Sequence, residues 1–174
     1  FAVEMDLRTL LKSSGVRNFS KLLSANVVAQ VIGLVVYPIL TRMYAPEDFG
    51  LLNLFLSIGG ILTLISIAEY QYAIVLPKEE KDAVSVFHVG IWALFCSTIC
   101  ISVSVIFSDS ISLLFKTPAL SDIYWLLPVY VFIMGLWNLL NYWYVRQQNF
   151  GTISVFQIFQ SVLSSGSKIV LGLM

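Results

Sequence analysis

Formal charge is scarce in this sequence. Only 11% of its 174 residues are charged, whereas 58% are hydrophobic, and the mean hydropathy is +0.86. An ordinary soluble domain carries roughly 25% charged residues. The ten basic and ten acidic residues cancel, so no net charge draws the chain to nucleic acid. With so little means of covering a water-exposed surface, the chain is predicted to be a membrane protein and not a cytosolic enzyme.

Residue patterns for covalent chemistry are missing as well. The chain has only two cysteines, Cys96 and Cys100, four apart in an apolar run, where small packing residues are typical. It has no glycine-rich phosphate loop, no metal-ligand spacing and no grouped Ser, His and Asp. We therefore expect no catalytic residues, no metal and no cofactor.

Long stretches without charged residues make up most of the sequence. The five intervals between charges that frame these stretches contain 20, 20, 26, 23 and 21 residues. Crossing about 30 Å of hydrocarbon takes roughly 20 helical residues, and a lone strand cannot satisfy its backbone in lipid. The sequence predicts an all-α, polytopic integral membrane protein with about five transmembrane helices. These spans are placed near residues 22–43, 51–76, 84–107, 125–145 and 153–174.

The distribution of basic residues predicts the topology. On alternate sides of the five spans, Lys and Arg number seven against two, which places the N-terminus in the cytoplasm. Residues 1–21 then form a basic, cytoplasmic segment, either a topological flank or a short amphipathic interfacial helix. The chain opens on Phe1 and its fifth span stops at Met174 without a polar flank, which indicates a bundle that is incomplete at its C-terminus.

Two of the predicted spans carry polar stripes at helical spacing. The stripe of the first span contains Asn26, Gln30, Gly33, Tyr37 and Thr41. That of the fifth contains Ser154, Gln157, Ser161, Ser164, Lys168 and Gly172. Such stripes indicate either close helix packing or a water-filled cavity lined by amides and hydroxyls. A third stripe of small residues, including Gly90, Ser97 and Ser104, favours packing.

Charged residues within or at the ends of spans are further candidates for the cavity. Lys168 and Glu69 lie inside apolar runs, where a charge costs roughly 2.5–3.5 kcal/mol even on lenient insertion scales. Glu69 could instead snorkel to the interface, and Arg42 at the end of the first span could be an anchor. The candidate cavity residues are Lys168, Gln157, Ser161, Ser164, Asn26, Gln30, Glu69 and Arg42.

Two local motifs resemble a known family. They are Leu40-Thr41-Arg42-Met43-Tyr44-Ala45-Pro46-Glu47-Asp48-Phe49-Gly50-Leu51 and Tyr70-Gln71-Tyr72-Ala73-Ile74-Val75-Leu76-Pro77-Lys78. Over about residues 18–174 the chain resembles polysaccharide biosynthesis proteins of the O-antigen flippase type, in the multidrug/oligosaccharidyl-lipid/polysaccharide exporter superfamily. One departure is the segment Glu69-Tyr70-Gln71, where relatives often have an arginine and then a glutamate around the tyrosine.

The resemblance implies most of the first lobe of a transporter with two lobes and about 12–14 helices. Such proteins move undecaprenyl-pyrophosphate-linked oligosaccharide across the bacterial cytoplasmic (inner) membrane by alternating access. The stripes of the first and fifth spans would line the cavity, and Lys168 would attract the pyrophosphate or an acidic sugar. Partners would be the lipid-linked oligosaccharide, the bilayer and, further, a glycan polymerase and chain-length regulator, with no nucleic acid. The alternatives are a cation-coupled multidrug or small-molecule exporter, a membrane glycan polymerase or ligase, and a structural subunit.

The cost of an intramembrane charge generates a first prediction. Lys168→Ala in the full-length protein should reduce glycan export while leaving membrane insertion intact, because the lysine then serves the substrate and not the fold. Surface glycan and the level of protein in the membrane measure the two effects. Wild-type export from this variant would remove Lys168 from the site.

Overall fold

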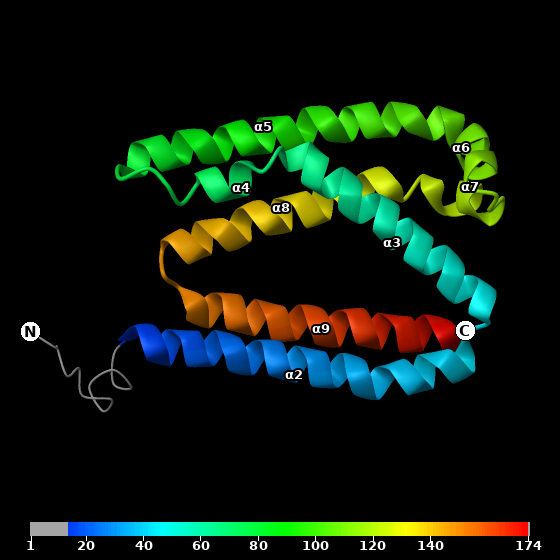
Figure 1. Ribbon diagram of the computed structural model, residues 1–174, viewed down its shortest axis with the longest axis horizontal. Helices are drawn as coiled ribbons and strands as arrows, with labels where there is room; N and C mark the ends of the chain where they lie inside the picture. The colour runs from blue at the N-terminus through cyan, green and yellow to red at the C-terminus, as the bar shows by residue number, and fades with distance from the viewer. Residues whose placement is uncertain (1–13, 174) are drawn as a thin grey trace, which may run out of the picture. The chain divides into compact units, whose positions relative to one another are not determined.

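Every regular element in the described part of the chain is a helix (Figure 1). The computed structural model describes residues 14–173, without the side chains of 14–19, 21, 22, 163 and 166–173. Most of the predicted segment 1–21 thus lies outside the described residues. The chain forms two compact units, one built from residues 1–44 and 147–174 and the other from residues 45–146. Each unit is described separately below.

The first unit is a pair of long helices, α2 (Ser14–Met43) and α9 (Phe150–Leu173). They lie side by side and run in the same direction (Figure 1). Five alternating spans require this course, because the first and fifth then cross in the same direction. The helix predicted near 22–43 extends back to Ser14, so part of the expected flank continues the span as helix.

The second unit packs three long helices around two apolar cores. They are α3 (Pro46–Ile67), α5 (Glu80–Ser104) and α8 (Leu127–Arg146). One core gathers around Phe55, Ile101, Leu120 and Val131, and the other contains Ile67, Ile74, Leu94 and Leu139. A short 3-10 turn, η1 (Val105–Phe107), and two short helices, α6 (Ser108–Leu114) and α7 (Ala119–Tyr124), connect α5 to α8.

The first sequence motif is the start of α3. Pro46 occupies the opening turn, where its missing N–H needs no partner, and Glu47 and Asp48 follow in the same turn. Carboxylates at this end stabilise a helix, because the unpaired N–H groups give it partial positive charge. The order proline, acid, acid is therefore explained by local helix physics.

The predicted span over 51–76 is a broken helix, which corrects the expectation of a continuous one. α3 ends at Ile67, and Ala68 and Glu69 both adopt left-handed backbone conformations, with φ of 45° and 62°. A four-residue helix, α4 (Tyr70–Ala73), then follows. Composition could not reveal this break, because neither residue is the glycine that normally marks a left-handed position.

Arg146 at the end of α8 holds the segment that follows α4. Its guanidinium donates hydrogen bonds to the carbonyl oxygens of Ile74 (3.2 Å), Pro77 (2.6 Å) and Glu79 (3.3 Å). The Ile74 and Pro77 carbonyls lie outside regular helix and would otherwise need water or another donor, whereas the Glu79 carbonyl also accepts from the Ala83 N–H. The second sequence motif is therefore anchored through its backbone by an arginine that lies about 70 residues later.

The small-residue stripe of α5 is a packing face. Ser97 Oγ donates to the Ser66 carbonyl of α3 at 3.4 Å, and Ser104 Oγ lies 3.2 Å from the Tyr124 hydroxyl. Gly90 is buried against Leu139 of α8. Small side chains let backbones approach in this way, which agrees with the packing interpretation of the third stripe.

Three helices among the described residues are long and apolar enough to cross a membrane, namely Leu23–Met43, Pro46–Ile67 and the run Glu80–Leu114. α8, with 20 residues, is not among these three, and it carries Asn138, Asn141 and several aromatic residues. In α9 the apolar stretch within the described side chains is Phe150–Val162. The fold is that of a polytopic, all-helical membrane protein.

Adjacent glycines in α3 give a matched test of this packing. A methyl group at Gly59 would lie 2.5 Å from Cε1 of Tyr130, whereas one at Gly60 would have nothing within 4 Å. Gly59→Ala should therefore destabilise the protein by about 1–3 kcal/mol through overpacking, and Gly60→Ala should not. Thermal unfolding in detergent measures both variants. Equal midpoints for the two would contradict the close approach of α3 and α8.

Candidate functional site

A short side-chain hydrogen bond joins the two helices of the first unit in their N-terminal halves. Gln157 Nε2 on α9 donates to Asn26 Oδ1 on α2 at 2.6 Å. One turn further along, Ser161 Oγ donates to the Ala29 carbonyl of α2 at 3.1 Å. We call these four residues the amide seam. Three of the predicted site residues, Asn26, Gln157 and Ser161, are thus brought together by the fold.

The amide seam leaves one acceptor without a donor. Gln157 Oε1 is buried and has no hydrogen-bond partner among the described residues. A buried amide oxygen left in this state costs about 1–3 kcal/mol, and its two lone pairs accept hydrogen bonds from any hydroxyl or N–H that reaches it. The seam therefore contains one buried acceptor that has no formal charge and no partner among the described residues.

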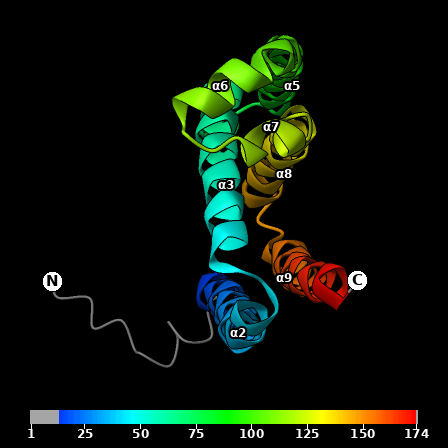
Figure 2. The ribbon, with the colours of Figure 1, turned by 90° about the vertical axis from the view of Figure 1, so that its right-hand side faces the viewer.

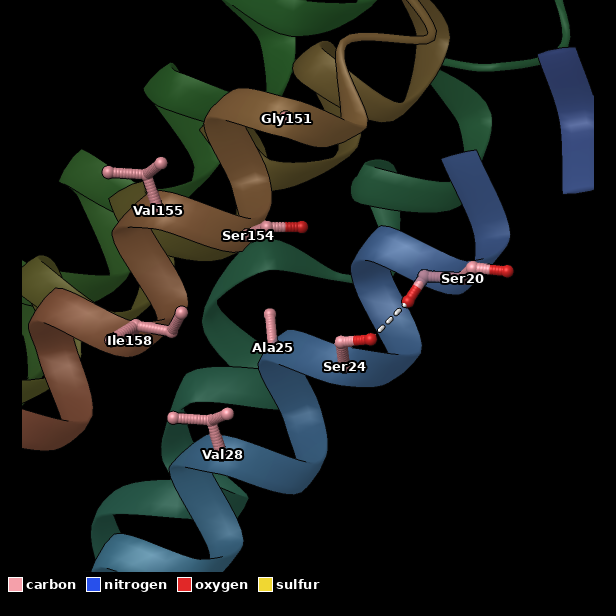
Figure 3. A pocket seen from close by; sticks show the side chains of 8 residues that line it. All are labelled: Ser20, Ser24, Ala25, Val28, Gly151, Ser154, Val155 and Ile158. Atoms are coloured by element: carbon pink, nitrogen blue, oxygen red, sulfur yellow. Dashed lines mark hydrogen bonds between the residues drawn. The ribbon is translucent and has the colours of Figure 1, made fainter. Parts of the chain in front are cut away.

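An open groove of about 510 Å³ lies beside the seam, nearer the beginnings of the two helices (Figure 3). Figure 3 shows Ala25 and Ser154 turned towards the space between α2 and α9. The hydroxyl groups of Ser24 and Ser154 donate to carbonyls one turn back in their own helices, at 2.8 Å each. Their protons are used internally, so the groove offers apolar walls and hydroxyl oxygens as acceptors.

Two predicted residues continue the seam along the same helices. Gln30 follows Asn26 by one turn on α2, and Ser164 follows Ser161 by one turn on α9, and both are exposed. Lys168 falls one turn beyond Ser164 in α9, but its side chain lies outside the described residues. The stripes thus pack together at their beginnings and present polar side chains further along.

The remaining predicted residues do not belong to the seam. Arg42 is exposed in the last turn of α2, sixteen positions after Asn26. Glu69 belongs to the second unit, where it is exposed at the left-handed break before α4. No group of three or more His, Cys, Asp or Glu in the described part of the chain is placed to hold a metal ion.

Sequence reasoning missed two polar side chains of the second unit. Arg146 is half-buried and binds three carbonyls. Gln71, beside Glu69, is only 3% exposed, and its Oε1 has no partner among the described residues. The signal for Gln71 was available, since an amide inside an apolar run costs free energy unless it is bonded.

Fold and site together define the class of protein. The chain is a multi-pass membrane protein whose candidate site is neutral, amide-rich and set between two parallel helices. It matches the family described as polysaccharide biosynthesis protein over residues 16–173, and it belongs to that family. No curated protein and no solved structure matches the chain.

The amide seam generates a prediction about the pairing of α2 and α9. Asn26→Ala and Gln157→Ala should each lower the stability of the protein, and the double variant should show a coupling of about 0.6–1.7 kcal/mol, as for hydrogen bonds between membrane helices. Thermal unfolding of the four proteins in detergent measures the cycle. Gln160→Ala is the matched control, because Gln160 is exposed on α9 and should not couple to Asn26. Zero coupling between Asn26 and Gln157 would contradict the seam.

Proposed function

We propose that this protein moves undecaprenyl-pyrophosphate-linked oligosaccharide from the cytoplasmic to the outer leaflet of the bacterial inner membrane, for O-antigen, capsule or exopolysaccharide synthesis. It acts as a flippase by alternating access and is not an enzyme. Membership of the polysaccharide biosynthesis family supports this proposal. The N-terminus faces the cytoplasm in this topology, which the excess of basic residues on that side favours.

The observation that carries the proposal is the unpartnered Gln157 Oε1 in a neutral amide seam. A glycan presents many hydroxyl groups and often no charge, so amides and hydroxyls are the groups that suit it. Gln30 and Ser164 extend these groups along α2 and α9 beyond the seam. Lys168, one turn further, would attract the pyrophosphate or an acidic sugar.

Complementation tests this function most directly. The protein is expressed from its own gene in a bacterium that lacks its O-antigen flippase, and surface glycan is measured. Recovery of surface glycan is the expected result. Absence of glycan at normal membrane levels, together with raised drug tolerance, would favour a cation-coupled exporter of the same superfamily.

A matched pair of variants tests the role of the seam in the same assay. Gln157→Met removes the unpartnered oxygen, together with the Nε2 that donates to Asn26, with little change in volume. We expect about a tenfold loss of surface glycan, the effect of roughly one lost hydrogen bond. Gln160→Met, on the exposed side of α9, should export normally. Membrane levels of both variants are measured by immunoblot. Equal export by the two variants would remove Gln157 from the substrate path.

A further inference from the structure

The connection between α5 and α8 has an unusual surface for a loop. It lies between the spans predicted near 84–107 and 125–145, and several of its large apolar side chains are exposed. We call the most exposed of them the apolar rim, namely Ile106, Phe107, Leu113, Leu114, Phe115 and Trp125. Leu114 and Ile106 are each 78% exposed. Several exposed apolar side chains on one short segment are typical of contact with a membrane or with another protein.

The segment that carries the rim is a folded structure. Ser112 is buried on α6, and Leu120 and Tyr124 are buried on α7, where they join the core around Phe55 and Val131. The rim residues therefore face outward because the opposite side of the segment is packed. Their exposure is a fixed property of the fold.

The length of the apolar run gives the direction of the segment relative to the bilayer. Glu80–Leu114 is a stretch of 35 residues, which as one straight helix would measure about 52 Å. The hydrocarbon layer is only about 30 Å thick, so the last part of the run cannot continue along the membrane normal. The 3-10 turn η1 redirects the chain, and Figure 2 shows α6 running crosswise to α5, which is viewed end-on.

A lysine at the end of α6 adopts a left-handed backbone conformation. Lys116 N donates to the Leu113 carbonyl and Thr117 N to the Ser112 carbonyl, both at 3.0 Å, which is the Schellman pattern of helix ends. Lys116 occupies the left-handed position, with φ of 54°, where glycine is unstrained. The lysine side chain is exposed and follows directly after Leu113, Leu114 and Phe115.

We propose that α6 and α7 form a membrane-interface anchor that inserts the apolar rim into the headgroup and upper acyl region of one leaflet, with Lys116 bound to lipid phosphate. The rim is continuous with the lipid-facing surface, because Ile106 and Phe107 extend the exposed side of α5 and Trp125 precedes α8. Aromatic residues favour this depth, and a lysine beside apolar side chains complements anionic headgroups. The partner of this surface is the bilayer itself.

Fluorescence quenching by lipids of known composition tests the depth of the anchor. The protein is expressed from its own gene with its native cysteines, Cys96 and Cys100 among them, replaced by serine. Leu114→Cys and, as matched control, Asp122→Cys on α7 are labelled with bimane and reconstituted in phosphatidylethanolamine and phosphatidylglycerol vesicles. Asp122 is exposed and polar on the same segment. Brominated acyl chains should quench the label at 114 and aqueous iodide should quench the label at 122.

Two outcomes would overturn the anchor. Quenching of both labels by iodide to the same extent would place the segment in water. Protection of the label at 114 from both quenchers would show that protein covers the rim. Neither outcome depends on transport, so the result is independent of the proposed flippase activity.

The role of Lys116 has its own measurement in the same vesicles. Association of spin-labelled phosphatidylglycerol with Lys116→Ala should be about fivefold weaker than with the wild type, the usual effect of one lysine at an anionic surface. Lys116→Arg keeps the charge and should restore association. If phosphatidylglycerol associates with Lys116→Ala as strongly as with the wild type, Lys116 does not bind lipid phosphate.

Discussion

The second unit depends on one constraint, namely that backbone carbonyls freed where a helix is interrupted must be bonded within the protein. Lipid offers no donors, and each unsatisfied group costs several kcal/mol. The second span is interrupted at Ala68 and Glu69, and regular helix does not resume until Glu80 apart from the short α4. Arg146 supplies donors to three carbonyls of this stretch. Arg146 thus ties the end of α8 to the segment between α4 and α5.

The two units use polar groups in different ways. In the second unit polar side chains fasten helices that are otherwise held by tightly packed apolar cores, as Ser97 and Ser104 do along α5. In the first unit two helices are joined by amides, and one amide oxygen is left over. Gln71 Oε1 in the second unit also has no partner among the described residues, but the oxygen of Gln157 lies beside a hydrogen bond that joins two helices.

Much of the helical plan could be predicted from the sequence, because it follows from gaps between charges and the thickness of a bilayer. The start of α3 at Pro46 was missed, because the span was placed from residue 51, although a proline followed by two acids is typical of a first helical turn. The break at Ala68 could not be predicted, because the residue types around it fit an unbroken helix. The hydrogen bonds of Arg146 could not be predicted either, because they go to backbone carbonyls, which every residue has. The polar stripes indicated which faces of the spans near 22–43 and 153–174 carry polar groups. They did not indicate that Asn26 would bond to Gln157.

The pairing of α2 with α9 also sets an order of events during synthesis. Asn26 and Gln157 are 131 positions apart, so α2 leaves the ribosome long before its partner exists. At about 5–20 residues per second, α2 waits roughly 7–26 s in the bilayer with its amide unpaired. During that interval the second unit, built from residues 45–146, has time to assemble. Among the described helices, α2 is thus made first but completes its pairing only with α9.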